Sequence, residues 1–247
     1  GVRLVGSEMC IRDRFRKNFC AVYQLCARTQ SAIIQNIKDV LEHKTQKTNQ
    51  KRIRKGETIM VNVGIIGAGR IGQVHMNSIL TRVPNAKIKA VADPFLSEEA
   101  DKKAKAAGAE YTTKDYKDIL ADKDIDAVII CSSTDTHSPI SIEAIKAGKH
   151  VFCEKPIDHD VDKIKEVIKT LEGTGLKYQV GFNRRFDHNF EAAQRAVVNG
   201  KIGAPHIIKI TSRDPEPPSA EYVKVSGGMF LDMTIHDFDM VLSLIHI

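Results

Sequence analysis

A glycine motif, Gly67-Ala68-Gly69-Arg70-Ile71-Gly72, lies between a β-branched run and a stretch with helical apolar spacing. The run Val61–Ile66 predicts a strand, and the apolar positions from Ile71 to Leu80 predict a helix. Glycines at this spacing allow a tight turn, a close approach of phosphate to backbone, and close packing of helix on strand. The motif therefore favours a dinucleotide-binding fold, although glycines alone would indicate only a tight turn.

Strand and helix patterns continue to alternate after this motif. The alternation is typical of a parallel sheet with helices on both faces. We therefore expect an α/β fold, a Rossmann-type doubly wound sheet, over residues 60–181. Its further predicted strands are Ile88–Ala92, Ala127–Cys131, Val151–Cys153 and Lys177–Phe182, and its predicted helices are Ser97–Ala107, Tyr116–Leu120, His137–Ala147 and Val161–Leu171.

The pattern changes after Phe182. A helix is expected at Phe190–Val198, a strand at His206–Thr211 and a helix at Asp232–Leu242, with a proline-rich loop before the last of these. We expect residues 182–241 to be the start of a truncated α+β substrate domain.

Both ends of the chain have a second interpretation at the level of DNA. Residues 9–14 can be encoded by ATG TGT ATA AGA GAC AGN, and residues 242–247 by its reverse complement, which resembles a transposon end used to tag DNA libraries. The triplets for 55–57 resemble a ribosome-binding sequence just before Met60. We expect 1–59 to be a non-native leader and 242–247 a non-native tail; a basic, acid-poor targeting segment is the alternative for the head.

The positive charge of the chain is confined to the head. Residues 1–59 hold 13 Lys/Arg against 5 Asp/Glu, which leaves 24 basic and 26 acidic residues from Met60 onward. Residues from Met60 onward therefore lack the basic excess expected of a protein that binds nucleic acid. No apolar run is long enough to span a membrane. Cys131 and Cys153 lie at apolar strand positions, which favours buried thiols and a cytoplasmic protein. No metal-ligand spacing is present, so no metal is expected.

The predicted cofactor is NAD. A pyrophosphate would bind at the glycine motif and the start of its helix, and Asp93 ends the second strand, where a carboxylate hydrogen-bonds the adenosine ribose and repels a 2′-phosphate. The alternative for Asp93 is a turn residue before Pro94. Ser132 and Thr134 follow the predicted strand at Ala127–Cys131 and can line the path of the cofactor. Thr136 can equally be no more than the cap of the next helix. The candidate cofactor-binding residues are Gly67, Gly69, Arg70, Ile71, Gly72, Asp93, Ser132, Thr134, Glu154 and Lys155.

Three further residues suit the oxidation of an alcohol. The reaction needs a base for the hydroxyl proton and a group that stabilises the developing alkoxide. His236 and Lys155 can supply these, and Asp232, four residues before His236, shares a helix face with it and can orient the imidazole. A surface ion pair is the alternative for Asp232 and His236.

These motifs resemble a known family. Glu154-Lys155-Pro156 after the glycine motif, followed by Gly227–Asp239, is similar to the Gfo/Idh/MocA oxidoreductases, most closely the inositol 2-dehydrogenases. The resemblance runs from Met60 to Met240. It implies NAD-dependent oxidation of a ring hydroxyl of myo-inositol, a small polyol, by a homo-oligomer, a tetramer in the family, with Lys155, Asp232 and His236 as catalytic residues.

The same resemblance places Arg185, Asp214 and Asp239 against the polyol, although each can also be a structural loop residue. A different sugar or scyllo-inositol as substrate, or a non-catalytic NAD-binding sensor, remain alternatives. His75, His137, His150 and His159 are predicted to be cap, loop or surface residues.

Overall fold

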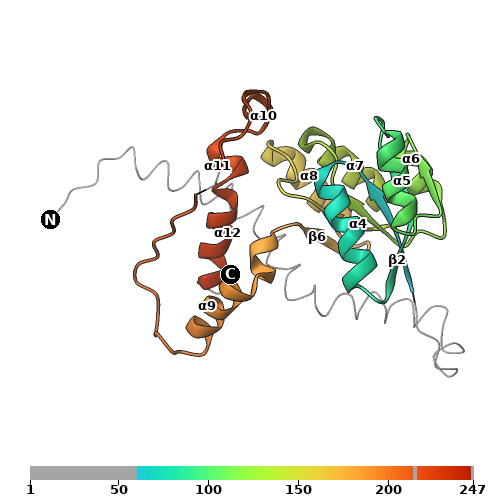
Figure 1. Cartoon of the computed structure of the whole chain (residues 1–247). Coiled ribbons are helices and arrows are strands. Elements are labelled where there is room, and N and C mark those ends of the chain that lie inside the picture. Colours follow the sequence, from blue (N-terminus) through green and yellow to red (C-terminus); the bar gives the residue numbers. More distant parts are fainter. Residues whose placement is uncertain (1–59, 214–215, 246–247) are drawn as a thin grey trace, which may run out of the picture. The chain divides into compact units, whose positions relative to one another are not determined.

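The computed structural model describes residues 60–213 and 216–245, and the chain divides between Val180 and Gly181 into two compact units (Figure 1). The predicted leader at 1–59 and Asp214 lie outside the described residues. Within the described part, no helix is both long and apolar enough to cross a membrane.

The first unit is a six-stranded sheet in the order β3-β2-β1-β4-β5-β6, and every paired strand is parallel. The predicted Rossmann-type doubly wound fold is therefore confirmed. The elements are β1 (Val61–Ile66), α4 (Arg70–Arg82), β2 (Ala86–Ala92), α5 (Glu98–Ala106), β3 (Tyr111–Thr113), α6 (Tyr116–Ala121), β4 (Ala127–Ile130), α7 (Thr134–Lys146), β5 (His150–Cys153), α8 (Val161–Leu171) and β6 (Tyr178–Val180).

The core lies where helices cover the central strands. Ile65 of β1 and Val128 of β4 are completely buried, because helices cover both faces of a parallel sheet. The sequence of each central strand is therefore almost continuously apolar. Met76 and Ile79 of α4 pack against β1 and β2. Burial of this apolar stripe stabilises α4, whose glycine-rich first turn has a low helix propensity of its own.

Helix ends follow local chemistry where a capping side chain is present. The Ser97 hydroxyl accepts a hydrogen bond from the Ala100 amide at 3.1 Å, and the Asp160 carboxylate accepts one from the Asp162 amide at 2.8 Å, so α5 and α8 begin at their caps. Helix α7 begins at Thr134, before the predicted His137, so Pro139 lies in its second turn and not at the first helical position that proline favours.

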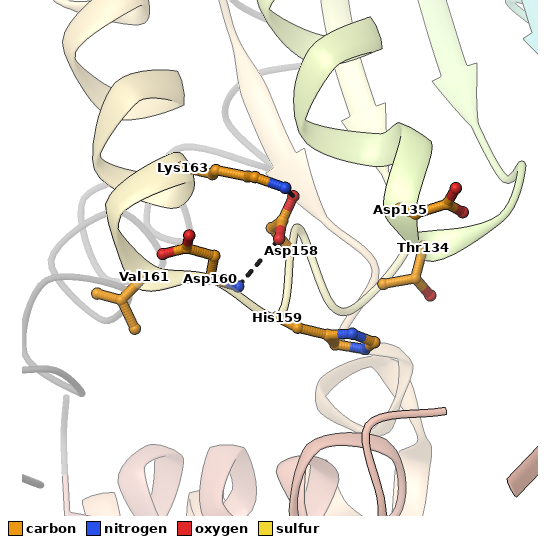
Figure 2. Close-up of a pocket in the computed structure, with 7 residues that line it drawn as sticks. All are labelled: Thr134, Asp135, Asp158, His159, Asp160, Val161 and Lys163. Atoms are coloured by element: carbon orange, nitrogen blue, oxygen red, sulfur yellow. Dashed lines mark hydrogen bonds and ion pairs between the residues drawn. The ribbon is translucent and has the colours of Figure 1, made fainter. Parts of the chain in front are cut away.

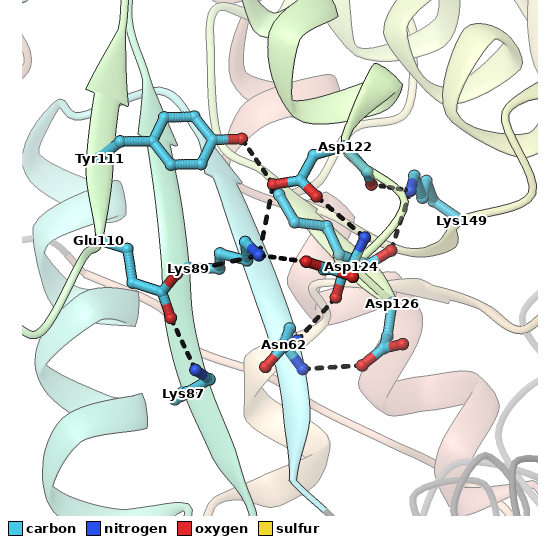
Figure 3. Close-up of polar contacts among 10 residues, drawn as sticks. Asn62, Lys87, Lys89, Glu110, Tyr111, Asp122, Asp124, Asp126 and Lys149 are labelled. Carbon is cyan, nitrogen blue, oxygen red and sulfur yellow. Dashed lines mark hydrogen bonds and ion pairs between the residues drawn. The ribbon is translucent and has the colours of Figure 1, made fainter.

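A polar network lies at the edge of the sheet where the strands begin (Figure 3). The ammonium of Lys149, which is 5% exposed, donates to the carbonyls of Asp122 at 2.5 Å and Ile125 at 2.9 Å. The Asn62 amide donates to the Asp126 carboxylate at 2.9 Å. These bonds fix the amino ends of β1, β4 and β5, so the opposite ends meet at one edge.

The second unit contains only helices among its described residues: the 3-10 turn η1 (Asn183–Phe186), α9 (His188–Val198), α10 (Ala220–Val225), α11 (Met229–Asp232) and α12 (Ile235–Leu244). The strand predicted at His206–Thr211 is wrong. A β-branched run forms a strand only beside a partner, and the described residues of this unit provide none. The helix predicted at Asp232–Leu242 is interrupted, since α11 ends at Asp232 and α12 begins at Ile235.

Candidate functional site at the carboxyl edge of the sheet

The glycine motif forms the turn between β1 and α4, and two of its glycines are required by packing. Gly67 has a φ of 104°, and a Cβ there would lie 2.6 Å from the backbone carbonyl of Cys131. A Cβ on Gly72 would lie 2.0 Å from the carbonyl oxygen of Gly67. The turn and the close contact of α4 with β1 therefore both need glycine.

Gly69 is different, because a Cβ there would meet no atom within 4 Å. It is the N-cap of α4 and provides no side-chain acceptor for the first helical amides, which begin at Arg70 and Ile71. An uncapped helix N-terminus that opens to free space suits an anion. These observations fit the pyrophosphate of a dinucleotide at the predicted position.

Asp93 lies at the carboxyl end of β2 and holds the glycine turn. Its Oδ2 accepts a hydrogen bond from the Ala68 amide at 2.7 Å, and its Oδ1 accepts one from the Phe95 amide at 2.8 Å. The turn alternative and the cofactor prediction are thus compatible, since the carboxylate shapes the backbone beside the predicted ribose position. That its negative charge repels the 2′-phosphate of NADP stays a prediction.

The loop after β4 faces the same edge. The hydroxyls of Ser132 and Thr136 lie 2.6 Å apart, and Thr136 donates to the Ser133 carbonyl at 2.7 Å. The cap of α7 is Ser133, so the alternative that Thr136 is the cap is wrong. The first residue of α7, Thr134, lines a pocket.

That pocket has a volume of about 620 Å³ and lies between the first turns of α7 and α8 (Figure 2). All of its lining residues belong to the first unit. The side chains facing it are mostly acidic or polar and come from the end of the β4 loop and from the segment after Lys155. They are Thr134, Asp135, Asp158, His159, Asp160, Val161 and Lys163.

Lys155 follows β5 at the carboxyl edge, partly buried, and its neighbour Glu154 orders the backbone around it. Glu154 Oε2 accepts a hydrogen bond from the Lys155 amide at 3.3 Å, and its Oε1 lies 2.8 Å from His75 Nε2. The Lys155–Pro156 peptide bond is cis. Glu154, predicted to contact the cofactor, therefore links the lysine loop to α4 through His75.

Sequence reasoning missed the positions of His75 and His137. His75 lies on α4 against Glu154, and its ring contacts Phe152 edge-on at 5.1 Å. His137 is only 2% exposed, inside α7, so its assignment as a surface, loop or cap residue is wrong. His150, in β5, accepts a hydrogen bond from the Lys177 amide, while His159 is exposed. The available signal was the spacing of His75, one helical turn after Gly72.

Cys131 and Cys153, the cysteines in the described part of this unit, are free thiols and at least partly buried. Burial raises the pKa of the Cys131 thiol, and the nearby Glu154 carboxylate raises it further. Burial also raises the pKa of Cys153, to about 12. Both thiols therefore stay protonated at neutral pH, which argues against nucleophilic cysteine chemistry at this edge.

In the second unit, the structure brings Arg185 and Asp239 together. Arg185 Nε lies 2.8 Å from Asp239 Oδ2 and Arg185 Nη2 lies 2.8 Å from Oδ1, a bidentate pair. Asp239 is 4% exposed; burial raises the pKa of its carboxyl, and the Arg185 guanidinium opposes that shift. A second ion pair joins Arg184 to Asp237 next to it.

Asp232 and His236 flank the interruption between α11 and α12. The Tyr222 hydroxyl donates to Asp232 Oδ1 at 2.9 Å, and the His236 ring meets Phe182 edge-on at 6.5 Å. The prediction that they share one continuous helix is wrong, because the turn at Met233-Thr234 separates the two helices. Lys155 belongs to the other unit, and its grouping with Asp232 and His236 stays a prediction.

Comparison with known proteins places both parts of the chain in one family. Residues 61–182 match the Gfo/Idh/MocA oxidoreductase family, NAD-binding Rossmann fold, and residues 190–246 match the Gfo/Idh/MocA C-terminal domain. The chain is 50% identical to "Uncharacterized oxidoreductase YrbE" of Bacillus subtilis over 74% of the chain and 53% of that protein. It is 46% identical to the myo-inositol 2-dehydrogenase of Thermotoga maritima, over 73% of the chain and 53% of the relative.

A solved structure agrees in both sequence and fold. Scyllo-inositol dehydrogenase from Lactobacillus casei, with bound NAD(H) and scyllo-inositol, has a TM-score of 0.69 and 38% sequence identity, covering 75% of this chain and 56% of that one. The chain spans about half the length of these relatives. The assignment rests on two family domains that follow one another in the sequence and on the Rossmann sheet of the first. The chain belongs to the Gfo/Idh/MocA family of oxidoreductases, and its first unit is the family's NAD-binding domain.

Proposed function

We propose that the complete protein oxidises a ring hydroxyl of myo-inositol to the ketone with NAD. The observation that carries this proposal is the position of Lys155 at the carboxyl edge of the sheet, the edge that also holds the glycine turn and Asp93. Ligands of open α/β sheets bind at this edge, where the strand order reverses between β1 and β4. The myo-inositol 2-dehydrogenase among the relatives supports the choice of substrate.

The cofactor is assigned to groups of the first unit. The glycine turn and the first amides of α4 would hold the pyrophosphate, Asp93 the ribose, and Ser132, Thr134 and Glu154 the path towards Lys155. NAD, when bound, supplies the hydride acceptor. The residues assigned to it are Gly67, Gly69, Arg70, Ile71, Gly72, Asp93, Ser132, Thr134, Glu154 and Lys155.

The chain's own residues handle the proton and the charge. We assign His236 as the base that takes the hydroxyl proton, Lys155 as the cation that stabilises the alkoxide oxygen, and Asp232 as the carboxylate that orients them. Arg185, Asp214 and Asp239 are assigned to the polyol hydroxyls. The bidentate Arg185–Asp239 pair is largely buried, so each group holds the other in a fixed position.

A second candidate is oxidation of scyllo-inositol or another sugar by the same groups, favoured by the solved relative that holds scyllo-inositol. A non-catalytic NAD sensor is the third, and it gives no reason for Lys155, Asp232 and His236 to occur together. We assign 60–181 to cofactor binding and 182–241 to the substrate domain. A cytoplasmic homo-oligomer, a tetramer by resemblance, stays a prediction.

The test is NADH formation with myo-inositol, scyllo-inositol and a panel of sugars, assayed on this chain and on the longest polypeptide that its gene encodes. Lys155→Met should lower turnover by about 10²–10³-fold, far more than it weakens NADH binding, because a charge-stabilising group is lost from the transition state. Lys169→Met, an exposed lysine on α8, is the matched control. NADH binding without turnover of any polyol would favour the sensor, and full turnover in Lys155→Met would remove Lys155 from the mechanism.

A further inference from the structure

His137 joins two loops at the carboxyl edge. Its ring is 2% exposed, Nδ1 lies 2.8 Å from the Pro156 carbonyl oxygen, and Nε2 lies 3.0 Å from the Ser132 carbonyl oxygen. Pro156 directly follows Lys155, and Ser132 belongs to the loop after β4. One side chain therefore contacts the backbone of the lysine loop and of a predicted cofactor loop.

Both partners of this ring are acceptors. A backbone carbonyl oxygen cannot donate, and a neutral imidazole carries one N–H, so a neutral ring forms only one of the two hydrogen bonds. Its second nitrogen would direct a lone pair at a carbonyl oxygen, which costs about 1–3 kcal/mol for a buried group. A ring that donates to one carbonyl oxygen still lies against the other, so His137 contacts both loops.

The next residue of α7, Ser138, contacts the same loop at Asp158, three residues after Lys155. The Ser138 hydroxyl donates to Asp158 Oδ2 at 2.5 Å, and the Asp160 amide donates to Asp158 Oδ1 at 2.9 Å. Asp158 is 6% exposed, and Lys163 lies 3.7 Å from it (Figure 2). Burial alone would raise the pKa of this carboxyl, but the hydroxyl, the amides and the ammonium hold it below its usual range.

We propose that His137 is a positioning residue that fixes the Lys155 loop against the Ser132 loop, with Ser138 as a second attachment at Asp158. This inference rests on the catalytic role proposed for Lys155. A clamp on backbone carbonyls does not touch substrate or cofactor. The clamp sets the backbone position from which the Lys155 side chain extends. Its loss should therefore lower turnover more than it weakens the binding of substrate or cofactor.

The kinetic arm uses the gene's longest polypeptide and three variants on one helix. His137→Gln cannot reach both carbonyls, and Ser138→Ala removes the second attachment. Ser141→Ala is the matched control, since Ser141 is buried in α7 but pairs with the Tyr178 hydroxyl at 2.9 Å and with neither Pro156 nor Asp158. His137→Gln should lower kcat by about 10²-fold, the effect of a misplaced reacting group, with KM and the NADH dissociation constant nearly unchanged.

Ser138→Ala should lower kcat less, and Ser141→Ala should retain it despite a lower melting temperature. Equal losses in kcat for His137→Gln and Ser141→Ala would overturn the proposal. If His137→Gln does not fold, Ser138→Ala measured against Ser141→Ala decides the kinetic arm.

The spectroscopic arm needs no activity. In the present chain labelled with ¹⁵N-histidine, the ring N–H of the buried His137 should exchange with solvent far more slowly than that of the exposed His159. Equally fast exchange of the two ring protons would overturn the clamp. Wild-type protein that oxidises no polyol would refute the proposed function, while this exchange measurement would still decide whether the clamp exists.

Discussion

At the scale of single residues, the three glycines of the turn differ in what surrounds them. Gly67 and Gly72 are fixed by close backbone neighbours, whereas Gly69 faces open space. The space beside Gly69 is where an anion would approach the first turn of α4. Gly69→Ala should therefore test cofactor binding, and Gly72→Ala should test packing.

Gly69→Ala should fold with a loss of less than about 1 kcal/mol, since its φ of −67° suits alanine and no atom obstructs the new methyl group. Its NADH affinity should fall, because the methyl group occupies the approach of the pyrophosphate. Gly72→Ala should lose stability at or above the upper end of roughly 1–3 kcal/mol, since backbone must move. Thermal unfolding and NADH titration measure both; a stable Gly72→Ala with normal affinity would contradict this account.

Asp93→Ser should lower NADH affinity by roughly 10–100-fold, the worth of one charged hydrogen bond, and raise the ratio of NADPH to NADH binding. The physical reason is the loss of a negative charge at the predicted ribose position. Asp124→Ser is the control, because this exposed carboxylate pairs with Lys89 near the beginnings of β1 and β4. An unchanged cofactor ratio in Asp93→Ser would show that Asp93 only shapes the turn.

At the scale of elements, short strands depend on side-chain contacts that periodicity does not reveal. Strand β3 has three residues, all half-buried, and was not predicted. Its Tyr111 hydroxyl donates to Asp122 Oδ2 at 3.0 Å, beside the ion pairs of Lys89 (Figure 3). This bond connects the edge strand to the segment that leads into β4.

Burial raises the pKa of Tyr111 to about 12, and the Asp122 carboxylate adds to the shift. The folded state thus holds this proton more tightly than the unfolded state, whose tyrosine pKa is about 10. The stabilising contribution is complete below pH ~10 and is lost as pH rises towards 12. Absorbance titration of tyrosinate should show a late-ionising component that is smaller by one tyrosine in Tyr111→Phe.

The unfolding free energy of Tyr111→Phe should correspondingly depend less on pH above ~10 than that of the wild type. A parallel dependence in both proteins would mean that Tyr111 ionises like an exposed tyrosine.

At the scale of the whole molecule, every residue assigned to NAD lies in the first unit, which ends at Val180. A ligand that binds only the folded state stabilises it by about 2.7 kcal/mol at a hundred times its dissociation constant. NADH at that concentration should slow amide exchange in β1 and β4 by up to about 100-fold, for amides that exchange through global unfolding of this unit. Exchange in α9 and α12 should change less, and equal protection of both units would contradict a cofactor site confined to the first.

The sequence by itself determined the Rossmann sheet, because continuous apolar strands, helical spacing and glycine turns are local patterns that burial on two faces requires. It also placed Gly69, Asp93 and Lys155 just after predicted strands, and the parallel strands of the sheet end at one edge. The break between Asp232 and His236, the absence of a strand at 206–211, the Arg185–Asp239 pair and the burial of His137 were decided only by tertiary structure. The Arg185–Asp239 pair and the burial of His137 depend on partners distant in sequence, and no local pattern records which partner a side chain will meet.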